Sequence, residues 1–158
     1  MNLAQYMERS AARVPEKIAV RHEGQSVTYR ELNIRCNRLA AGLKQMGLAT
    51  GDRCALMLPN SIHSITAYYA IAKLGAVVIP INYLYREHEL NHIFSDSKPK
   101  AFIGARPYLS ETIQTYIKKR VAPYKYPRII HIDLQPLPKS VTGKILKKEI
   151  RKKFGNVQ

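Results

Sequence analysis

The sequence predicts an α/β protein: a parallel-sheet unit followed by a smaller α+β unit. Short apolar runs alternate with helical patterns between residues 53 and 103, and this order is typical of parallel strands joined by crossover helices. The pattern breaks at Arg106-Pro107. A chain of 158 residues is long enough to bury a core. We therefore expect an N-terminal unit over residues 1–105 and a C-terminal unit over residues 106–158.

The first well-marked element is a helix over residues 28–46. Thr28 and Glu31 have the spacing of a capping box, and Gly47 suits the position after a helix end. Apolar residues then recur at steps of four and three, which places them on one helical face. These residues are Leu32, Cys36, Leu39, Leu43 and Met46.

The next elements follow the order strand, helix, strand, helix, strand. Residues 53–58, 76–81 and 100–103 are short apolar runs typical of buried strands. Residues 61–74 and 86–95 have the periodicity of helices. Together they predict a parallel sheet of three strands.

The C-terminal unit is predicted to contain two helices, one strand and a loop. Ser110 begins a helix that ends near residue 120, residues 128–132 form a strand, and residues 135–143 are a loop rich in proline. Lys144 begins a final helix whose apolar residues repeat every four positions, at Leu146, Ile150 and Phe154.

The charge of the chain is strongly positive and unevenly distributed. Lys and Arg outnumber Asp and Glu by 26 to 11, and residues 108–158 carry 12 cations against 3 anions, a net of +9. Such a segment favours an anionic partner. A small basic binding module for nucleic acid or anionic membrane is therefore one alternative function, although no specific nucleic-acid motif accompanies the charge.

The number of cysteines and the length of the apolar runs indicate the cellular compartment. Cys36 and Cys54 are the two cysteines, which gives no support to a disulfide framework or a metal site and favours a reduced, cytoplasmic environment. No apolar stretch has the length of a signal peptide core or a transmembrane segment. We expect a cytoplasmic protein without a transmembrane segment.

One loop, Thr142-Gly143-Lys144, has a pattern suited to chemistry. A lysine after a flexible glycine, at the start of a basic helix, extends a mobile ammonium that stabilises negative charge on carboxylate or phosphoryl groups. The alternative is a simple turn with a solvated lysine. A Walker phosphate loop is excluded, because it requires glycine where Pro138 stands and Ser or Thr where Ile145 stands.

Four segments carry a family resemblance. Residues 116–128 (YIKKRVAPYKYPR) and 137–146 (LPKSVTGKIL) resemble the C-terminal subdomain of AMP-forming acyl-CoA synthetases, of the acyl-adenylate-forming superfamily. Residues 27–32 (VTYREL) and 73–82 (KLGAVVIPIN) are similar to the first two core motifs of that family.

The resemblance implies that Lys144, flanked by Thr142 and Gly143, contacts the acyl carboxylate and the α-phosphate during adenylation. The basic charge of the C-terminal segment makes Lys125 and Arg128 candidates for weak contacts to coenzyme A phosphates, with a solvated basic surface as the alternative. The resemblance also implies ATP, coenzyme A and Mg²⁺ as cofactors and a fatty or related carboxylic acid as substrate.

The family's Ser/Thr/Gly-rich phosphate loop, its ribose-binding aspartate motif and its hinge have no counterpart in the sequence. Between Ile103 and Leu109 the chain passes directly from early to late family segments, which indicates a large internal deletion. Adenylation requires many groups positioned together, so we expect a truncated and inactive form of the ligase. A sheet that has lost its neighbours also exposes apolar faces, which predicts self-association.

Overall fold

The computed structural model describes residues 2–105 and 129–132 of the chain. The predicted helices that begin at Ser110 and Lys144, and the predicted loop over residues 135–143, lie outside these residues. The boundary between units of residues 1–105 and 106–158 stays a prediction.

The described part is built around a parallel sheet with the strand order β4-β3-β5-β6. Its strands are β3 (Arg53–Met57), β4 (Val77–Pro80), β5 (Ala101–Ala105) and β6 (Ile129–Ile132). Cys54 of β3 lies opposite Val78 of β4 and Ala101 of β5. The predicted parallel α/β fold is confirmed, and the sheet gains a fourth strand from the second half of the sequence.

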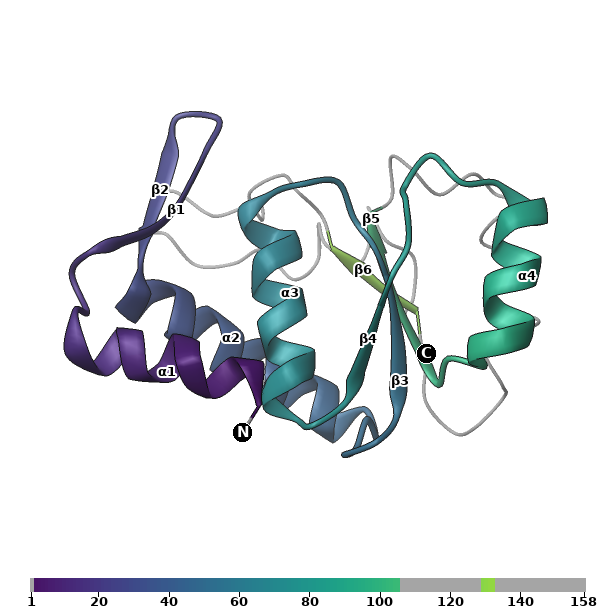
Figure 1. The fold of residues 1–158 in the computed structure, drawn as a ribbon, viewed down its shortest axis with the longest axis horizontal. Helices are drawn as coiled ribbons and strands as arrows, with labels where there is room; N and C mark the ends of the chain where they lie inside the picture. The colour runs from purple at the N-terminus through teal and green to yellow at the C-terminus, as the bar shows by residue number, and fades with distance from the viewer. Residues whose placement is uncertain (1, 106–128, 133–158) are drawn as a thin grey trace, which may run out of the picture.

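Helices cover both faces of this sheet (Figure 1). On one face, α2 (Tyr29–Gln45) and α3 (Ile62–Lys73) pack against alternate strand residues such as Leu56 and Ile103. On the other face, α4 (Glu87–Ser97) packs through Leu90 and Phe94 against Phe102. Residues on both faces are buried, so the strands have the apolar, non-alternating sequences expected of a covered parallel sheet.

The capping box predicted at the start of α2 is present. The Thr28 Oγ1 atom accepts the Glu31 N–H at 3.2 Å, and the Glu31 carboxylate accepts the Thr28 N–H at 2.8 Å. Leu32, Cys36 and Leu43 are buried as predicted, whereas Met46 is 38% exposed. Met46 departs from the predicted face because α2 ends at Gln45 and Met46 is its C-cap.

The elements before α2 were not predicted from the sequence. They are α1 (Leu3–Arg13) and an antiparallel hairpin of β1 (Ile18–His22) and β2 (Gln25–Thr28). The hairpin turns at Glu23 and Gly24, which both have positive φ angles, of 48° and 75°. Such a pair of angles is the requirement of a type I′ turn. The buried side chains of Met7, Val27 and Ile62 join α1, the hairpin and α3 into one apolar cluster.

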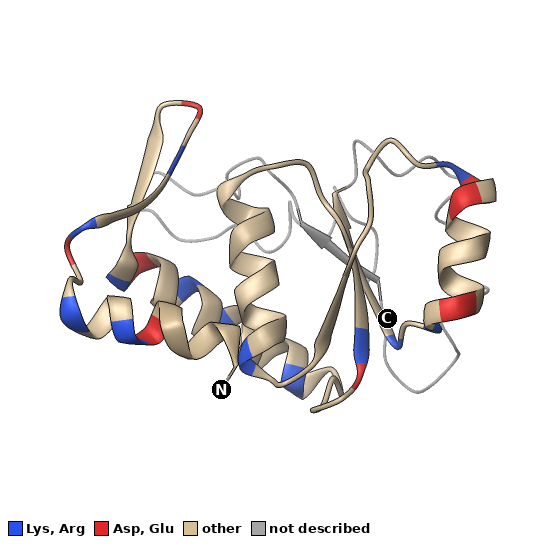
Figure 2. Cartoon of the chain, in the orientation of Figure 1, with Lys and Arg blue, Asp and Glu red and all other residues tan. Residues whose placement is uncertain are grey.

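Charged side chains lie mainly on the helices and at the ends of strands (Figure 2). At the amino end of the sheet, the Lys100 ammonium pairs with the Asp52 carboxylate at 2.5 Å. The helices of the described residues are too short or too polar to cross a bilayer.

Candidate functional site

The five residues predicted to form the site lie outside the described part of the chain. They are Thr142, Gly143, Lys144, Lys125 and Arg128. Their roles therefore stay predictions.

Among the described residues, the topology of the sheet favours a ligand site at its carboxyl edge. The chain runs from β3 to β4 on one side and then crosses to β5 on the other side of β3. The direction in which successive strands are added to the sheet therefore reverses between β3 and β5. Open α/β sheets bind ligands outside the carboxyl ends of their strands, near such a switch point. Pro59 and Asn60 follow β3 at this edge and lead into α3.

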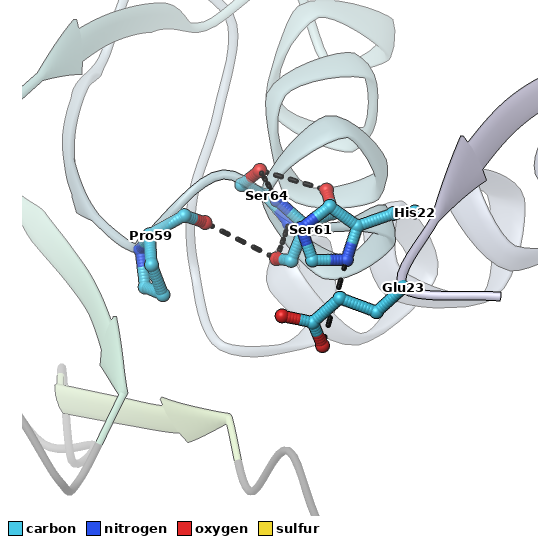
Figure 3. Close-up of polar contacts among 5 residues, drawn as sticks. All are labelled: His22, Glu23, Pro59, Ser61 and Ser64. Atoms are coloured by element: carbon cyan, nitrogen blue, oxygen red, sulfur yellow. Dashed lines mark hydrogen bonds and ion pairs between the residues drawn. The ribbon is translucent and has the colours of Figure 1, made fainter. Parts of the chain in front are cut away.

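The start of α3 is closed by its own side chains (Figure 3). The Ser61 hydroxyl accepts the Ser64 N–H at 3.1 Å, and the Ser64 hydroxyl accepts the Ser61 N–H at 3.0 Å. The Ser61 hydroxyl also donates to the Pro59 carbonyl at 3.2 Å. The reciprocal cap stabilises the helix, and it occupies the amides of Ser61 and Ser64 that an anion would otherwise use.

A small polar hollow of about 240 Å³ lies beside this cap. Burial, and then the nearby Arg35 guanidinium, lower the pKa of His63, so its imidazole is neutral at pH 7. The His22 Nδ1 atom lies 3.9 Å from a Glu23 carboxylate oxygen (Figure 3). No lysine or arginine is among the residues that line this hollow, which are His22, Glu23, Gln25, Pro59, Asn60, Ser61, Ile62 and His63.

A larger pocket of about 550 Å³ lies on the other side of Asn60. It is bounded by the ends of β3 and β4, by α3 and by α1. Burial, followed by the neighbouring Tyr29, Cys36 and Tyr68, raises the pKa of Tyr69 in its wall. The lining is mainly apolar and aromatic: Leu3, Leu56, Leu58, Asn60, Ser64, Ile65, Tyr68, Tyr69, Pro80, Ile81, Asn82 and Tyr83.

Neither cysteine is arranged as a nucleophile. Both thiols are buried, and burial raises the pKa of Cys36 to about 11 and that of Cys54 to about 12. The reactive thiolate is therefore scarce at neutral pH. Across the residues that the structure places, no three His, Cys, Asp or Glu side chains gather as a metal site would require.

Neither hollow was predicted from the sequence. The gap between the predicted strand over residues 53–58 and the predicted helix over residues 61–74 is the one signal that falls at this edge. Hollows of this kind are formed by segments distant in sequence, here α1, the hairpin, α3 and the loop after β4.

The fold defines an open, doubly wound α/β domain, a class that binds ligands at the carboxyl edge of its sheet. Residues 7–153 match the family model described as AMP-binding enzyme. The chain belongs to this family, as the resemblance predicted.

Curated relatives agree with the family assignment. The chain is 38% identical to 3-oxocholest-4-en-26-oate–CoA ligase of Rhodococcus rhodochrous over 108 residues, which are 68% of this chain and 20% of that protein. It is 40% identical to pyochelin synthase PchD of Pseudomonas aeruginosa over 104 residues, which are 66% of this chain and 19% of that protein. The chain thus spans about a fifth of the length of these relatives.

A solved structure supports the fold assignment. The N-terminal domain of FACL13 from Mycobacterium tuberculosis superposes with a TM-score of 0.70 at 31% identity, covering 83% of this chain and 33% of that one. The curated relatives thus include a CoA ligase and a pyochelin synthase, and nothing in these comparisons supports the alternative of a basic nucleic-acid or membrane-binding module.

Proposed function

We propose that this chain derives from an AMP-forming acyl-CoA ligase and does not complete the ligase reaction by itself. One observation carries the proposal: the family match runs over residues 7–153, while each curated relative above is matched over only about a fifth of its length. A match on both sides of residues 103–109, without the phosphate loop between them, supports an internal deletion.

The resemblance assigns the chemistry of the parent enzyme to one loop. Lys144, with Thr142 and Gly143 beside it, would hold the acyl carboxylate and the α-phosphate, and Lys125 and Arg128 would bind phosphates of coenzyme A. The substrate class would be a fatty or related carboxylic acid. ATP, coenzyme A and Mg²⁺ would be the parent's cofactors, and the two buried free thiols support a cytoplasmic setting.

The described residues do not fit a nucleoside triphosphate. The lining of both hollows lacks lysine and arginine, and the cap of α3 occupies the amides of Ser61 and Ser64. Catalysis by a lysine needs a substrate that is already oriented by other groups. The described residues show no set of groups that would orient a nucleotide, which supports an inactive chain.

Pyrophosphate release is the direct test of this proposal. The full chain is incubated with ATP, Mg²⁺, coenzyme A and a panel of fatty acids, and pyrophosphate is measured over hours. We expect no release above that of Lys144→Ala. Release that depends on Lys144 and persists in Lys139→Ala, a matched lysine in the same loop, would overturn the proposed inactivity.

Ligand binding is tested separately from turnover. AMP and coenzyme A are each titrated calorimetrically into the full chain. We expect no heat from AMP at millimolar concentration, because the family's phosphate loop and ribose-binding motif have no counterpart in the sequence. If coenzyme A binds, the variant Lys125→Ala/Arg128→Ala should weaken it. Binding unchanged by these substitutions would remove the proposed contacts.

We also propose that the chain self-associates through the sheet. β4 is the outer strand of the order, and Val77 on it is 49% exposed. Exposed strand edges with apolar side chains favour pairing with another chain. Light scattering should report dimers or larger species, and a monodisperse monomer at micromolar concentration would contradict the proposal.

A further inference from the structure

The apolar pocket at the carboxyl edge has the position and size of a small-molecule site. Leu56 and Leu58 contribute the end of β3, Pro80 and Ile81 the end of β4, and Leu3 closes the pocket from α1. Its volume of about 550 Å³ falls within the range of sites that hold ligands of drug size.

The walls of the pocket are aromatic on two sides. Tyr68 and Tyr69 come from α3, with their rings edge to face and 6.3 Å between ring centroids. Tyr83 comes from the loop after β4. Tyrosine rings in a pocket wall can pack against an aromatic ring of a ligand through offset or edge-to-face contacts.

The electrostatics of the lining restrict the ligand. None of the residues that line this pocket carries a charge, and its polar side chains are the amides of Asn60 and Asn82 and hydroxyls such as that of Ser64. A carboxylate or phosphate would lose its hydration without meeting a cation. The Tyr69 hydroxyl is protonated at neutral pH, because burial raises its pKa from an already high value, and it is available to donate a hydrogen bond to a ligand.

We propose that this pocket binds an uncharged aromatic small molecule that carries a hydroxyl or amide group. The proposal rests on described residues alone and does not depend on the ligase ancestry. The pocket is distinct in chemistry from a site for an acyl carboxylate or a nucleotide, both of which are anions.

The probes are 4-fluorophenol and 4-fluorobenzoate, which share a fluorophenyl ring and differ in the charge of the polar group at neutral pH. Their binding to the full chain is followed by ¹⁹F NMR in about 0.3 M salt, which screens non-specific attraction to the basic chain. We expect saturable binding of the phenol with a dissociation constant on the order of 1 mM, as suits a fragment. Binding of the benzoate should be at least roughly tenfold weaker, because its charge is unpaired in the pocket.

Two matched tyrosine variants locate the binding. Tyr68→Ala removes part of a pocket wall and should weaken binding of the phenol by about two- to tenfold. Tyr6→Ala removes an exposed tyrosine of α1 that is not among the lining residues, and should leave affinity unchanged. Thermal melting of both variants checks that they fold.

A third variant tests the charge argument. Asn60 lines the pocket from an exposed position, so Asn60→Lys adds a cation without burying it. Affinity for the benzoate should rise about two- to fivefold, while affinity for the phenol stays the same.

Three results would each overturn the proposal: no saturable phenol binding, equal binding of phenol and benzoate by the unaltered chain, or equal effects of the Tyr68 and Tyr6 variants. If the phenol does not bind saturably, an apolar side chain of a protein partner becomes the alternative occupant of the pocket.

Discussion

The ion pair that docks α1 onto α3 should respond unequally to removal of its two partners. Glu8 of α1 pairs with Lys73 of α3, whose side chain is 7% exposed, whereas that of Glu8 is 46% exposed. The lysine thus depends on the carboxylate, while the carboxylate keeps access to water. We predict that Glu8→Gln destabilises the fold more than Lys73→Met does.

The magnitude follows from the exposure of the two side chains. Removing one partner of a fully buried pair costs about 3–5 kcal/mol, because the other charge is left without compensation. Glu8 is half exposed, so water enters when it is removed, and we expect about 1–3 kcal/mol for Glu8→Gln. Lys73→Met removes the buried charge and keeps the apolar stem, so its cost should be below about 1 kcal/mol.

Urea denaturation of the two single variants and the double variant measures these values and their coupling. The free energy of unfolding of the double variant should be close to that of Lys73→Met, since no buried charge remains in either. Tm should fall by about 4 °C for each kcal/mol in a chain of this size. The usual effect of a surface substitution is within about 0.5 kcal/mol. A free energy of unfolding for Glu8→Gln that lies this close to the value for the unaltered protein would refute the reasoning.

Three further predictions concern the core, a turn and the thiols. Phe102→Ala, at a fully buried position, should lower the free energy of unfolding by about 3–5 kcal/mol in urea. Gly75→Ala should cost about 1–3 kcal/mol, because φ is +69° and the new Cβ would lie 3.0 Å from Thr50 Cγ2; an unchanged Tm would contradict this. The pKa values of Cys36 and Cys54 rise from 9.0 to about 11 and about 12 on folding, so the folded thiols keep protons that unfolded thiols lose. The contribution of the two thiols to the free energy of unfolding is complete below pH 9. Above pH 9 it should fall by about 1.4 kcal/mol per pH unit for each thiol. The free energy of unfolding of a Cys36→Ala/Cys54→Ala variant should therefore fall less steeply with pH.

The sequence predicted those elements whose signals are local. The capping box of Thr28 and Glu31 and the spacing of apolar residues fixed α2, and the apolar runs at residues 53–58 and 100–103 became β3 and β5. Each of these signals depends on neighbours within a few residues, which a sequence displays directly.

The missed helix α1 depends on contacts between distant segments. α1 begins with a capping box at Asn2 and Gln5, a signal of the same kind as that of α2 but with Asn and Gln in place of Thr and Glu. Its buried residues are only Ala4 and Met7, so its apolar stripe is narrow. It is fixed by distant contacts: the Asn2 side chain donates to the Ala72 carbonyl, and Glu8 pairs with Lys73.

The candidate site divides in the same way. Motif resemblance predicted the Thr142-Gly143-Lys144 loop from consecutive residues. The pocket of Tyr68, Tyr69 and Tyr83 could not be predicted, because its walls come from α1, α3 and two strand ends that only the tertiary fold brings together.

The pairing of β6 with β5 leads to a last prediction about how the two halves of the sequence are coupled. Ile103 lies opposite Ile130 and Ala105 opposite Ile132 in a parallel ladder, although residues 128–132 belong to the segment that resembles the family's C-terminal subdomain. We propose that this strand takes the place beside β5 that the proposed deletion would have left open.

Amide hydrogen exchange on the full chain tests the proposal. Amides of β6 should be protected to about the same free energy as those of β5, since strands of one ladder open together. Ile130→Pro removes a backbone N–H and distorts the ladder, so it should reduce protection in β5 while the β1–β2 hairpin keeps its protection. Ile130→Val is the control and should preserve both. Exchange of β6 amides within seconds, together with unchanged protection of β5 in Ile130→Pro, would show that the halves are independent.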